Sequence, residues 1–277
     1  MKFWKRIGTI LLGMAPMPAA VAIQYILLIP FLGLSSAYSF MRTHSSSYFM
    51  DYAYDIWSNN LFNAWFSVVF SVSIILLFGY WYSCQFEPFS LKPVAMRRFA
   101  RPGMIFGVLI LSIGLQYVVN YVFNITAAIN PEWLDAFMDL DIGTQNFGLI
   151  LYAVFLAPIN EELLFRGVSL GYLKKAMPFW LANLIQALLF GIYHMNVMQA
   201  VYAFVIGLFL GYVCQKGGSI FYSILLHIIY NFLTSYASGL LFWGNNSFFN
   251  IIWIADAIII PILGIYLFHI SSRQNKI

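Results

Sequence analysis

Long apolar segments alternate with short polar ones along the whole chain. A helix that spans a bilayer needs about 20 mostly apolar residues, and eight segments approach or exceed that length. They lie at 7–33, 62–83, 103–125, 146–172, 179–195, 197–214, 219–238 and 248–270. The pattern predicts an all-α, polytopic membrane protein with about eight transmembrane helices.

The first apolar segment is irregular. Its start is basic and resembles a signal peptide, but apolar sequence continues to Leu34, which is too long for the apolar region of such a peptide. We therefore expect a first helix that is not cleaved. Prolines inside a helix remove a hydrogen bond and bend it, so this helix is expected to be kinked at Pro16, Pro18 and Pro30.

The sequence predicts one integral membrane domain, which can be described in two parts. Residues 1–140 hold the first three predicted helices and a polar, aromatic external loop at 34–60. Residues 141–277 hold the last five helices, and a short acidic loop at 126–145 joins the two parts. Pairs of glycines four residues apart, which let membrane helices approach closely, occur at Gly103/Gly107, Gly167/Gly171 and Gly207/Gly211.

Composition supports a membrane protein. Of 277 residues, 62% are hydrophobic and only 9% are charged, whereas about a quarter are charged in a soluble domain. The net charge of +4 could suggest nucleic acid as a partner, but the basic residues are segregated. On one side of an eight-helix arrangement lie Lys2, Lys5, Arg6, Lys92, Arg97, Arg98, Arg101, Lys174, Lys175, Lys216, Arg273 and Lys276.

This segregation predicts the orientation. Only Arg42 falls on the opposite side, with the acidic loops. Because cytoplasmic loops carry the excess of Lys and Arg, we expect a multi-pass protein of the cell membrane with both termini cytoplasmic. The expected partners are the lipid bilayer and a substrate, with no nucleic acid. Cys84 and Cys214 have no metal-binding spacing and are interpreted as packing residues.

The segment "NEELLFRG", 160–167, puts charges into the fourth predicted helix. A charge at mid-bilayer costs about 2.5–3.5 kcal/mol on insertion scales. Glu162 and Arg166 are four residues apart, on one helix face, and can form an ion pair. Glu161 points about 100° away and is left without that partner. Glu162 is therefore predicted to be structural and Glu161 to be available for chemistry.

Two further helices carry polar residues of a suitable kind. Phe190 and His194 are four residues apart on the fifth, as are His227 and Asn231 on the seventh. At 1.5 Å per residue, Glu161, His227 and His194 lie roughly 20, 16 and 24 Å from the cytoplasmic ends of their helices. The three can therefore converge near mid-membrane. Asp256, in the eighth helix, has no patterned partner and is assigned to packing or pairing.

This set of groups suits hydrolysis. A carboxylate and an imidazole can remove a proton from water, while a second imidazole and an amide can bind the oxyanion that forms. With no serine or cysteine adjacent to either histidine, the sequence favours an activated water over a covalent nucleophile. Zinc held by Glu161, His194 and His227 is the alternative, although the chain has no HExxH motif.

The ordered motifs EExxxR, FxxxH and HxxxN, within 160–232, resemble those of the CAAX protease and bacteriocin-processing (CPBP, or Abi) family of intramembrane proteases. The resemblance implies about eight helices around a cavity that opens toward the cytoplasm. It implies water activation by Glu161 and His194, oxyanion stabilisation by His227 and Asn231, and support by Glu162, Arg166 and Phe190.

The same resemblance implies a glutamate-type protease without a cofactor. A zinc metalloendopeptidase is the alternative interpretation. Its substrate would be a peptide or a membrane-anchored protein, lipidated or not, of the CAAX or the bacteriocin leader type. The main alternative is a membrane scaffold or bacteriocin self-immunity protein without catalysis. A transporter would predict internal repeats or paired broken helices, which the sequence lacks.

Overall fold

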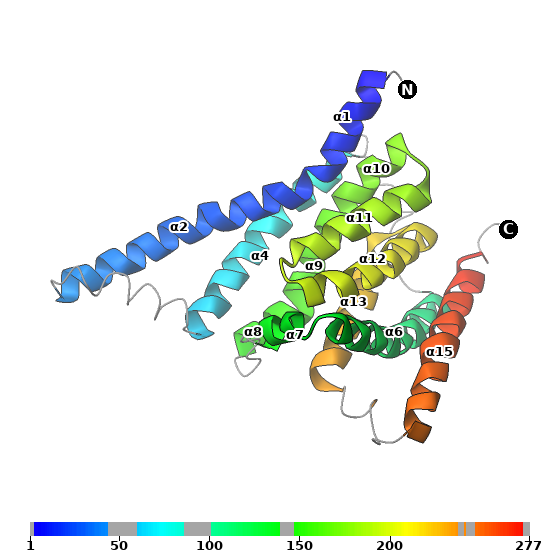
Figure 1. Ribbon diagram of the computed structural model, residues 1–277. Helices are drawn as coiled ribbons and strands as arrows, with labels where there is room; N and C mark the ends of the chain where they lie inside the picture. Colours follow the sequence, from blue (N-terminus) through cyan, green and yellow to red (C-terminus); the bar gives the residue numbers. More distant parts are fainter. Residues whose placement is uncertain are drawn as a thin grey trace.

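A computed structural model describes residues 3–43, 60–85, 101–138, 147–237, 241 and 247–273. This part of the chain contains helices and no strands, which confirms the all-α prediction (Figure 1). The helices are α1 (Phe3–Met14), α2 (Pro16–Thr43), α4 (Asn60–Ser83), α6 (Pro102–Ile129), α7 (Pro131–Met138), α8 (Phe147–Leu151), α9 (Ala157–Glu162), α10 (Leu170–Ala176), α11 (Phe179–Tyr193), α12 (Val197–Gly217), α13 (Ile220–Tyr236) and α15 (Ser247–Arg273).

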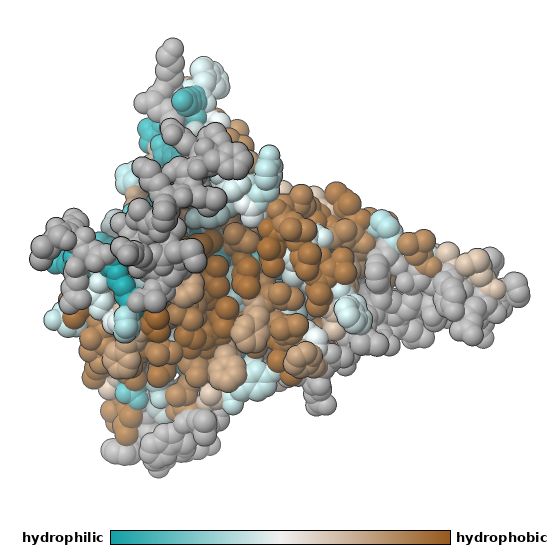
Figure 2. All heavy atoms as spheres, turned by 180° about the vertical axis from the view of Figure 1, so that it is seen from behind, coloured by the Kyte–Doolittle hydropathy of each residue, from teal (hydrophilic) through white to brown (hydrophobic). Residues whose placement is uncertain are grey.

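The apolar helices make this a multi-pass membrane protein. Among the described residues, six stretches are long and apolar enough to cross a bilayer, and α11 and α13 are shorter apolar helices. Together they match the eight predicted segments. Figure 2 shows apolar side chains across the middle of one face, with hydrophilic residues gathered toward the upper left.

The first predicted segment, 7–33, is two helices. The helix is interrupted at Ala15, and α2 begins at Pro16. At the start of a helix the missing N–H of proline costs no hydrogen bond. Pro30 lies inside α2, which continues to Thr43. The expectation that a loop begins at residue 34 is therefore wrong, and the rest of the predicted loop, 44–59, lies outside the described residues.

The predicted loop at 126–145 is also largely helical. Helix α6 runs to Ile129, and α7 begins at Pro131 after the single residue Asn130. The side-chain Oδ1 of Asn130 accepts a hydrogen bond from the N–H of Glu132 at 3.0 Å, which satisfies one free donor at the start of α7. Residues 139–146 lie outside the described residues.

The fourth predicted segment, 146–172, contains two π-helical segments that the sequence did not predict. These are η1 (Tyr152–Leu156) and η2 (Leu163–Ser169), and α9 lies between them. π-Helical segments are rare in proteins as a whole. Where they occur, they are often at functional sites, because the extra residue in a turn redirects the side chains. Here they lie on either side of α9, whose last two residues are Glu161 and Glu162.

Close contact between α6 and α15 holds the last helix in place. A Cβ atom built on Gly264 of α15 would lie 2.5 Å from the backbone nitrogen of Leu111 on α6. One built on Gly107 would lie 2.6 Å from the backbone nitrogen of Phe268. The expected role of Gly107 in close helix approach is confirmed, although its partner helix was not predictable.

We expect Gly264→Ala to force α6 and α15 apart, because its Cβ meets backbone and not a flexible side chain. Overpacking of this kind costs about 1–3 kcal/mol. Gly79→Ala is the matched control, since no atom lies within 4 Å of a Cβ built there, and both variants share the same gain in helix propensity. Thermal unfolding in detergent should show a lower midpoint for Gly264→Ala alone. Equal midpoints would contradict the close contact.

Candidate active site

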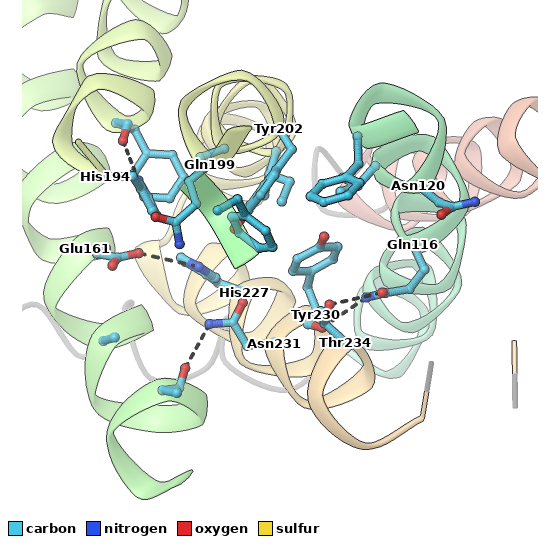
Figure 3. A pocket seen from close by; sticks show the side chains of 18 of the residues that line it. Gln116, Asn120, Glu161, His194, Gln199, Tyr202, His227, Tyr230, Asn231 and Thr234 are labelled. Atoms are coloured by element: carbon cyan, nitrogen blue, oxygen red, sulfur yellow. Dashed lines mark hydrogen bonds and ion pairs between the residues drawn. The ribbon is translucent and has the colours of Figure 1, made fainter. Parts of the chain in front are cut away.

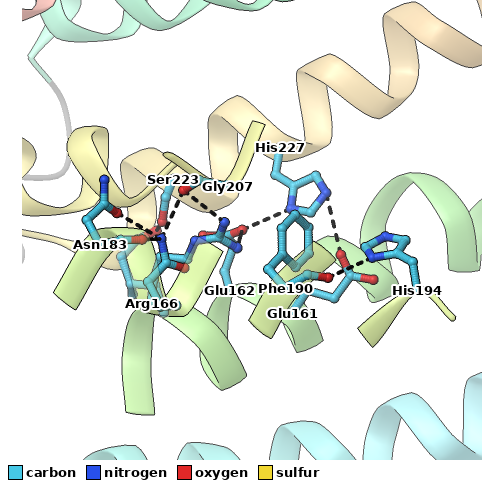
Figure 4. A network of polar contacts seen from close by, with 11 residues as sticks. Glu161, Glu162, Arg166, Asn183, Phe190, His194, Gly207, Ser223 and His227 are labelled. Atoms are coloured by element: carbon cyan, nitrogen blue, oxygen red, sulfur yellow. Dashed lines mark hydrogen bonds and ion pairs between the residues drawn. The ribbon is translucent and has the colours of Figure 1, made fainter. Parts of the chain in front are cut away.

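A buried ion pair lies at the centre of the site. The Nη1 of Arg166 donates to the Oε1 of Glu162 at 2.8 Å, and neither side chain has any exposed surface. The guanidinium also lies 4.4 Å from the centre of the Phe190 ring, a cation–π contact, and its Nη2 donates to the carbonyl of Gly207 at 3.3 Å. The predicted pair between Glu162 and Arg166 is confirmed (Figure 4).

His227 lies between the two glutamates. Its Nδ1 is 2.9 Å from the Oε1 of Glu162, and its Nε2 is 3.6 Å from the Oε2 of Glu161. A hydrogen bond from Nδ1 to a carboxylate fixes the orientation of the ring and directs Nε2 at Glu161. The sequence separated Glu161 from Glu162 by their helix faces, but one imidazole bridges both carboxylates.

His194 forms the end of α11 and is held by its own helix. Its Nδ1 lies 2.9 Å from the carbonyl oxygen of Phe190, one turn earlier. The ring of Phe190 contacts the rings of His194 and His227 edge to face, with centroids 5.0 and 5.8 Å away. Phe190 therefore packs against both histidines as well as Arg166.

Asn231 lies one turn after His227 on α13. Its Nδ2 donates to the carbonyl of Ala153 in η1 at 2.9 Å. An amide nitrogen carries two hydrogens, so this bond fixes the side chain and leaves a second N–H for another acceptor.

These groups surround one cavity of about 420 Å³ (Figure 3). All four residues that the sequence assigned to catalysis line it: Glu161, His194, His227 and Asn231. The structure thus brings together side chains from α9, α11 and α13.

The opposite wall of the cavity was missed by the sequence analysis. Gln116 and Asn120 of α6, and Phe137 of α7, line it. Gln116 is tied to α13, since its Nε2 donates to the carbonyl of Tyr230 and its Oε1 accepts from the hydroxyl of Thr234, each at 3.0 Å. The spacing of two amide residues four apart in an apolar helix was the signal that could have found this wall.

Other candidates take no direct part in the cavity. Ser223 lies four residues before His227, so the expectation that no serine is close to either histidine is wrong. Its hydroxyl donates to the carbonyl of Ile220 at 2.9 Å. Cys84 and Cys214 are free thiols, and neither these residues nor Asp256 lines the cavity. Within the described ranges, no group of three or more His, Cys, Asp or Glu side chains is arranged to hold a metal ion.

Comparison with known families adds an independent observation. Residues 143–233 match the model of the family described as "Type II CAAX prenyl endopeptidase Rce1-like". The region that holds the motifs is therefore similar to this family. Searches of curated proteins and of solved structures found no match. The Rce1-like region begins before α8 and ends within α13, so it contains all three motifs but not α6 or α7.

The Rce1-like match confirms the resemblance inferred from the motifs and, at the level of the family, supports a CAAX-type intramembrane endopeptidase. It does not include individual residue roles. These depend on the geometry around Glu161 and His227.

We expect Arg166→Met to be strongly destabilising, because it leaves the Glu162 carboxylate buried without its cation. Removing one partner of a buried pair costs about 3–5 kcal/mol. The double variant Glu162→Gln/Arg166→Met should recover most of that loss, since no unpaired charge remains. Unfolding in detergent micelles measures both free energies. A double variant as unstable as the single one would show that the pair does not act as a unit.

Proposed function

We propose that this protein is an intramembrane endopeptidase in which Glu161 activates a water molecule to hydrolyse a peptide bond. The observation that carries the proposal is the position of Glu161. Its carboxylate lines the cavity, 3.6 Å from the Nε2 of His227, and its side chain is 15% exposed, whereas that of Glu162 is fully buried. Glu161 is thus the carboxylate that water and substrate can reach.

In the proposed reaction, Glu161 takes a proton from the water as the oxygen attacks the carbonyl carbon of the substrate. The carbon becomes tetrahedral, and negative charge develops on the former carbonyl oxygen. Donors aimed at that oxygen stabilise the transition state more than the ground state. Glu161 then returns the proton to the leaving amine, which completes hydrolysis without a covalent intermediate.

The remaining roles follow from which donors are still available. Asn231 has a second amide hydrogen, and His227, when protonated, donates from both ring nitrogens. Its Nδ1–H is held by Glu162, so its Nε2–H is the one that can reach the oxyanion. His194, fixed through Nδ1 to Phe190, presents Nε2 and is assigned to orienting the attacking water beside Glu161.

The substrate proposed is a membrane-associated protein or peptide with a CAAX-type end or a bacteriocin-type leader, lipidated or not. The family description names prenyl endopeptidases, which makes the CAAX class the first to test.

Glu161→Gln should abolish proteolysis while leaving the fold intact, because glutamine has nearly the same shape but cannot accept the proton. Protein termini would be compared between host strains that lack the protein or express wild type, Glu161→Gln or Glu132→Gln at matched levels. Glu132, exposed on α7, is the control. Termini should appear with wild type and Glu132→Gln only.

If no such terminus exists, and Glu161→Gln rescues a deletion phenotype as well as wild type does, the protein is a scaffold or self-immunity protein.

The glutamate mechanism predicts that activity does not require a metal. Protein treated with a chelator and dialysed should keep its full rate, and elemental analysis should find no stoichiometric zinc. Loss of activity that returns on adding zinc, with Glu161, His194 and His227 as the implied ligands, would instead establish the metalloendopeptidase.

We also propose that the protein lies in the cell membrane with both termini in the cytoplasm. Single cysteines at Lys175, at the end of α10, and at Glu132, at the start of α7, test this in a background without Cys84 and Cys214. An impermeant thiol reagent should label intact cells at position 132 and reach position 175 only after permeabilisation. The reverse pattern would invert the topology.

A further inference from the structure

The junction between α11 and α12 reverses the chain sharply beside the catalytic groups. His194 ends α11, and α12 begins at Val197. Between them, Met195 has a φ of 53°. This is in the left-handed region of backbone conformation, which residues other than glycine rarely adopt. Backbone strain of this kind persists only where surrounding structure enforces it. The reversal brings the first turn of α12 to the same cavity as His194.

Asn196 anchors this reversal through both ends of its side-chain amide. Its Oδ1 accepts from the backbone N–H of Gln199 at 3.2 Å and so caps α12. Its Nδ2 donates to the carbonyl of Ala136 on α7 at 3.4 Å. One residue therefore fixes the start of α12 relative to His194 and to α7, whose Phe137 lines the cavity.

Gln199 is the polar side chain that this anchoring places at the cavity. It lines the cavity with Glu161, His194 and Asn231, and Figure 3 shows its amide directed toward His227. It lies in none of the three sequence motifs. Its backbone N–H is already satisfied by Asn196. Its side-chain amide hydrogen-bonds the hydroxyl of Tyr202, another residue that lines the cavity.

A peptide inside a membrane cavity needs hydrogen-bond partners of this kind. Placing a peptide unit in apolar surroundings without compensating bonds costs several kcal/mol. A glutamine side chain offers one acceptor and two donors. The hydroxyl of Tyr202 uses one of these sites, and those left can pair with the main chain of an extended peptide. Because it carries no charge, it adds no further ion to a site that already contains two carboxylates.

We propose that Gln199 hydrogen-bonds the main chain of the substrate beside the bond that is cleaved, and that Asn196 positions it there. This rests on the proposed endopeptidase function and adds a substrate-contacting residue to it. The contact is with the main chain and so fixes the register of the peptide against Glu161 without selecting side chains.

The variants follow from the local geometry. Gln199→Leu keeps a side chain of similar size, and the capped backbone N–H, but removes the amide. Gln199→Glu keeps the shape and an acceptor but loses the two donors. Gln215→Leu is the control on the same helix, since Gln215 is exposed and accepts from the Nζ of Lys174 at 2.7 Å, away from the cavity.

The probe is a synthetic peptide that spans a Glu161-dependent cleavage site found in the host, presented to purified full-length protein in lipid nanodiscs. Gln199→Leu should lower kcat/KM roughly tenfold, as expected for one lost hydrogen bond to the substrate. Its unfolding midpoint should fall only slightly, from the lost bond to Tyr202. Gln215→Leu should match wild type. Peptides in which single amide bonds near the cleaved bond are replaced by esters then test the contact itself.

One ester, beside the cleaved bond, should slow wild type but have no additional effect on Gln199→Leu, since the same hydrogen bond is already missing. Equal rates for wild type and Gln199→Leu, or ester penalties that are the same in both, would overturn the role of Gln199 while leaving the protease intact. If no peptide bond is cut in a Glu161-dependent manner, the proposed function itself fails.

Discussion

The site depends on two opposite charges that stabilise each other in an interior without water. Glu162 and Arg166 are completely buried, and either one alone would be costly in the apolar interior. Paired, they provide a fixed carboxylate against which the Nδ1 of His227 is held at 2.9 Å. The ring of His227 then faces Glu161. One buried ion pair thereby fixes the imidazole that lies next to the Glu161 carboxylate.

The surrounding helices stabilise this pair through the backbone. The carbonyl of Gly207 accepts from Arg166 and also from the Nε2 of Gln186 at 3.0 Å. Two donors can share it because α11 and α12 pack closely there, with the Cα of Ala187 only 3.1 Å from where a Cβ of Gly207 would lie. The glycine recorded in the sequence as a packing residue therefore also exposes a backbone oxygen to the ion pair.

The length of the apolar segments was enough to predict the eight apolar helical regions. The spacing of polar residues along single helices was enough to find the four groups at the cavity. Asn231 and His194 were found in this way. Sequence spacing was insufficient where the geometry depends on departures from a regular helix. Two such departures lie at the cavity: the π-helical segments on either side of α9, and the left-handed Met195 just before α12. Neither leaves a pattern in hydropathy.

The cavity is lined by two parts of the chain, and only one of them matches the family model. The motif residues lie within 143–233, the Rce1-like region, whereas Gln116 and Asn120 line the opposite wall from α6, outside that region. The groups that act in the proposed reaction must keep a fixed geometry, whereas the opposite wall of the cavity only has to fit the proposed substrate. Family resemblance therefore bears on the chemistry around Glu161 and His227, whereas α6 and α7 form a wall of the cavity to which that resemblance does not extend.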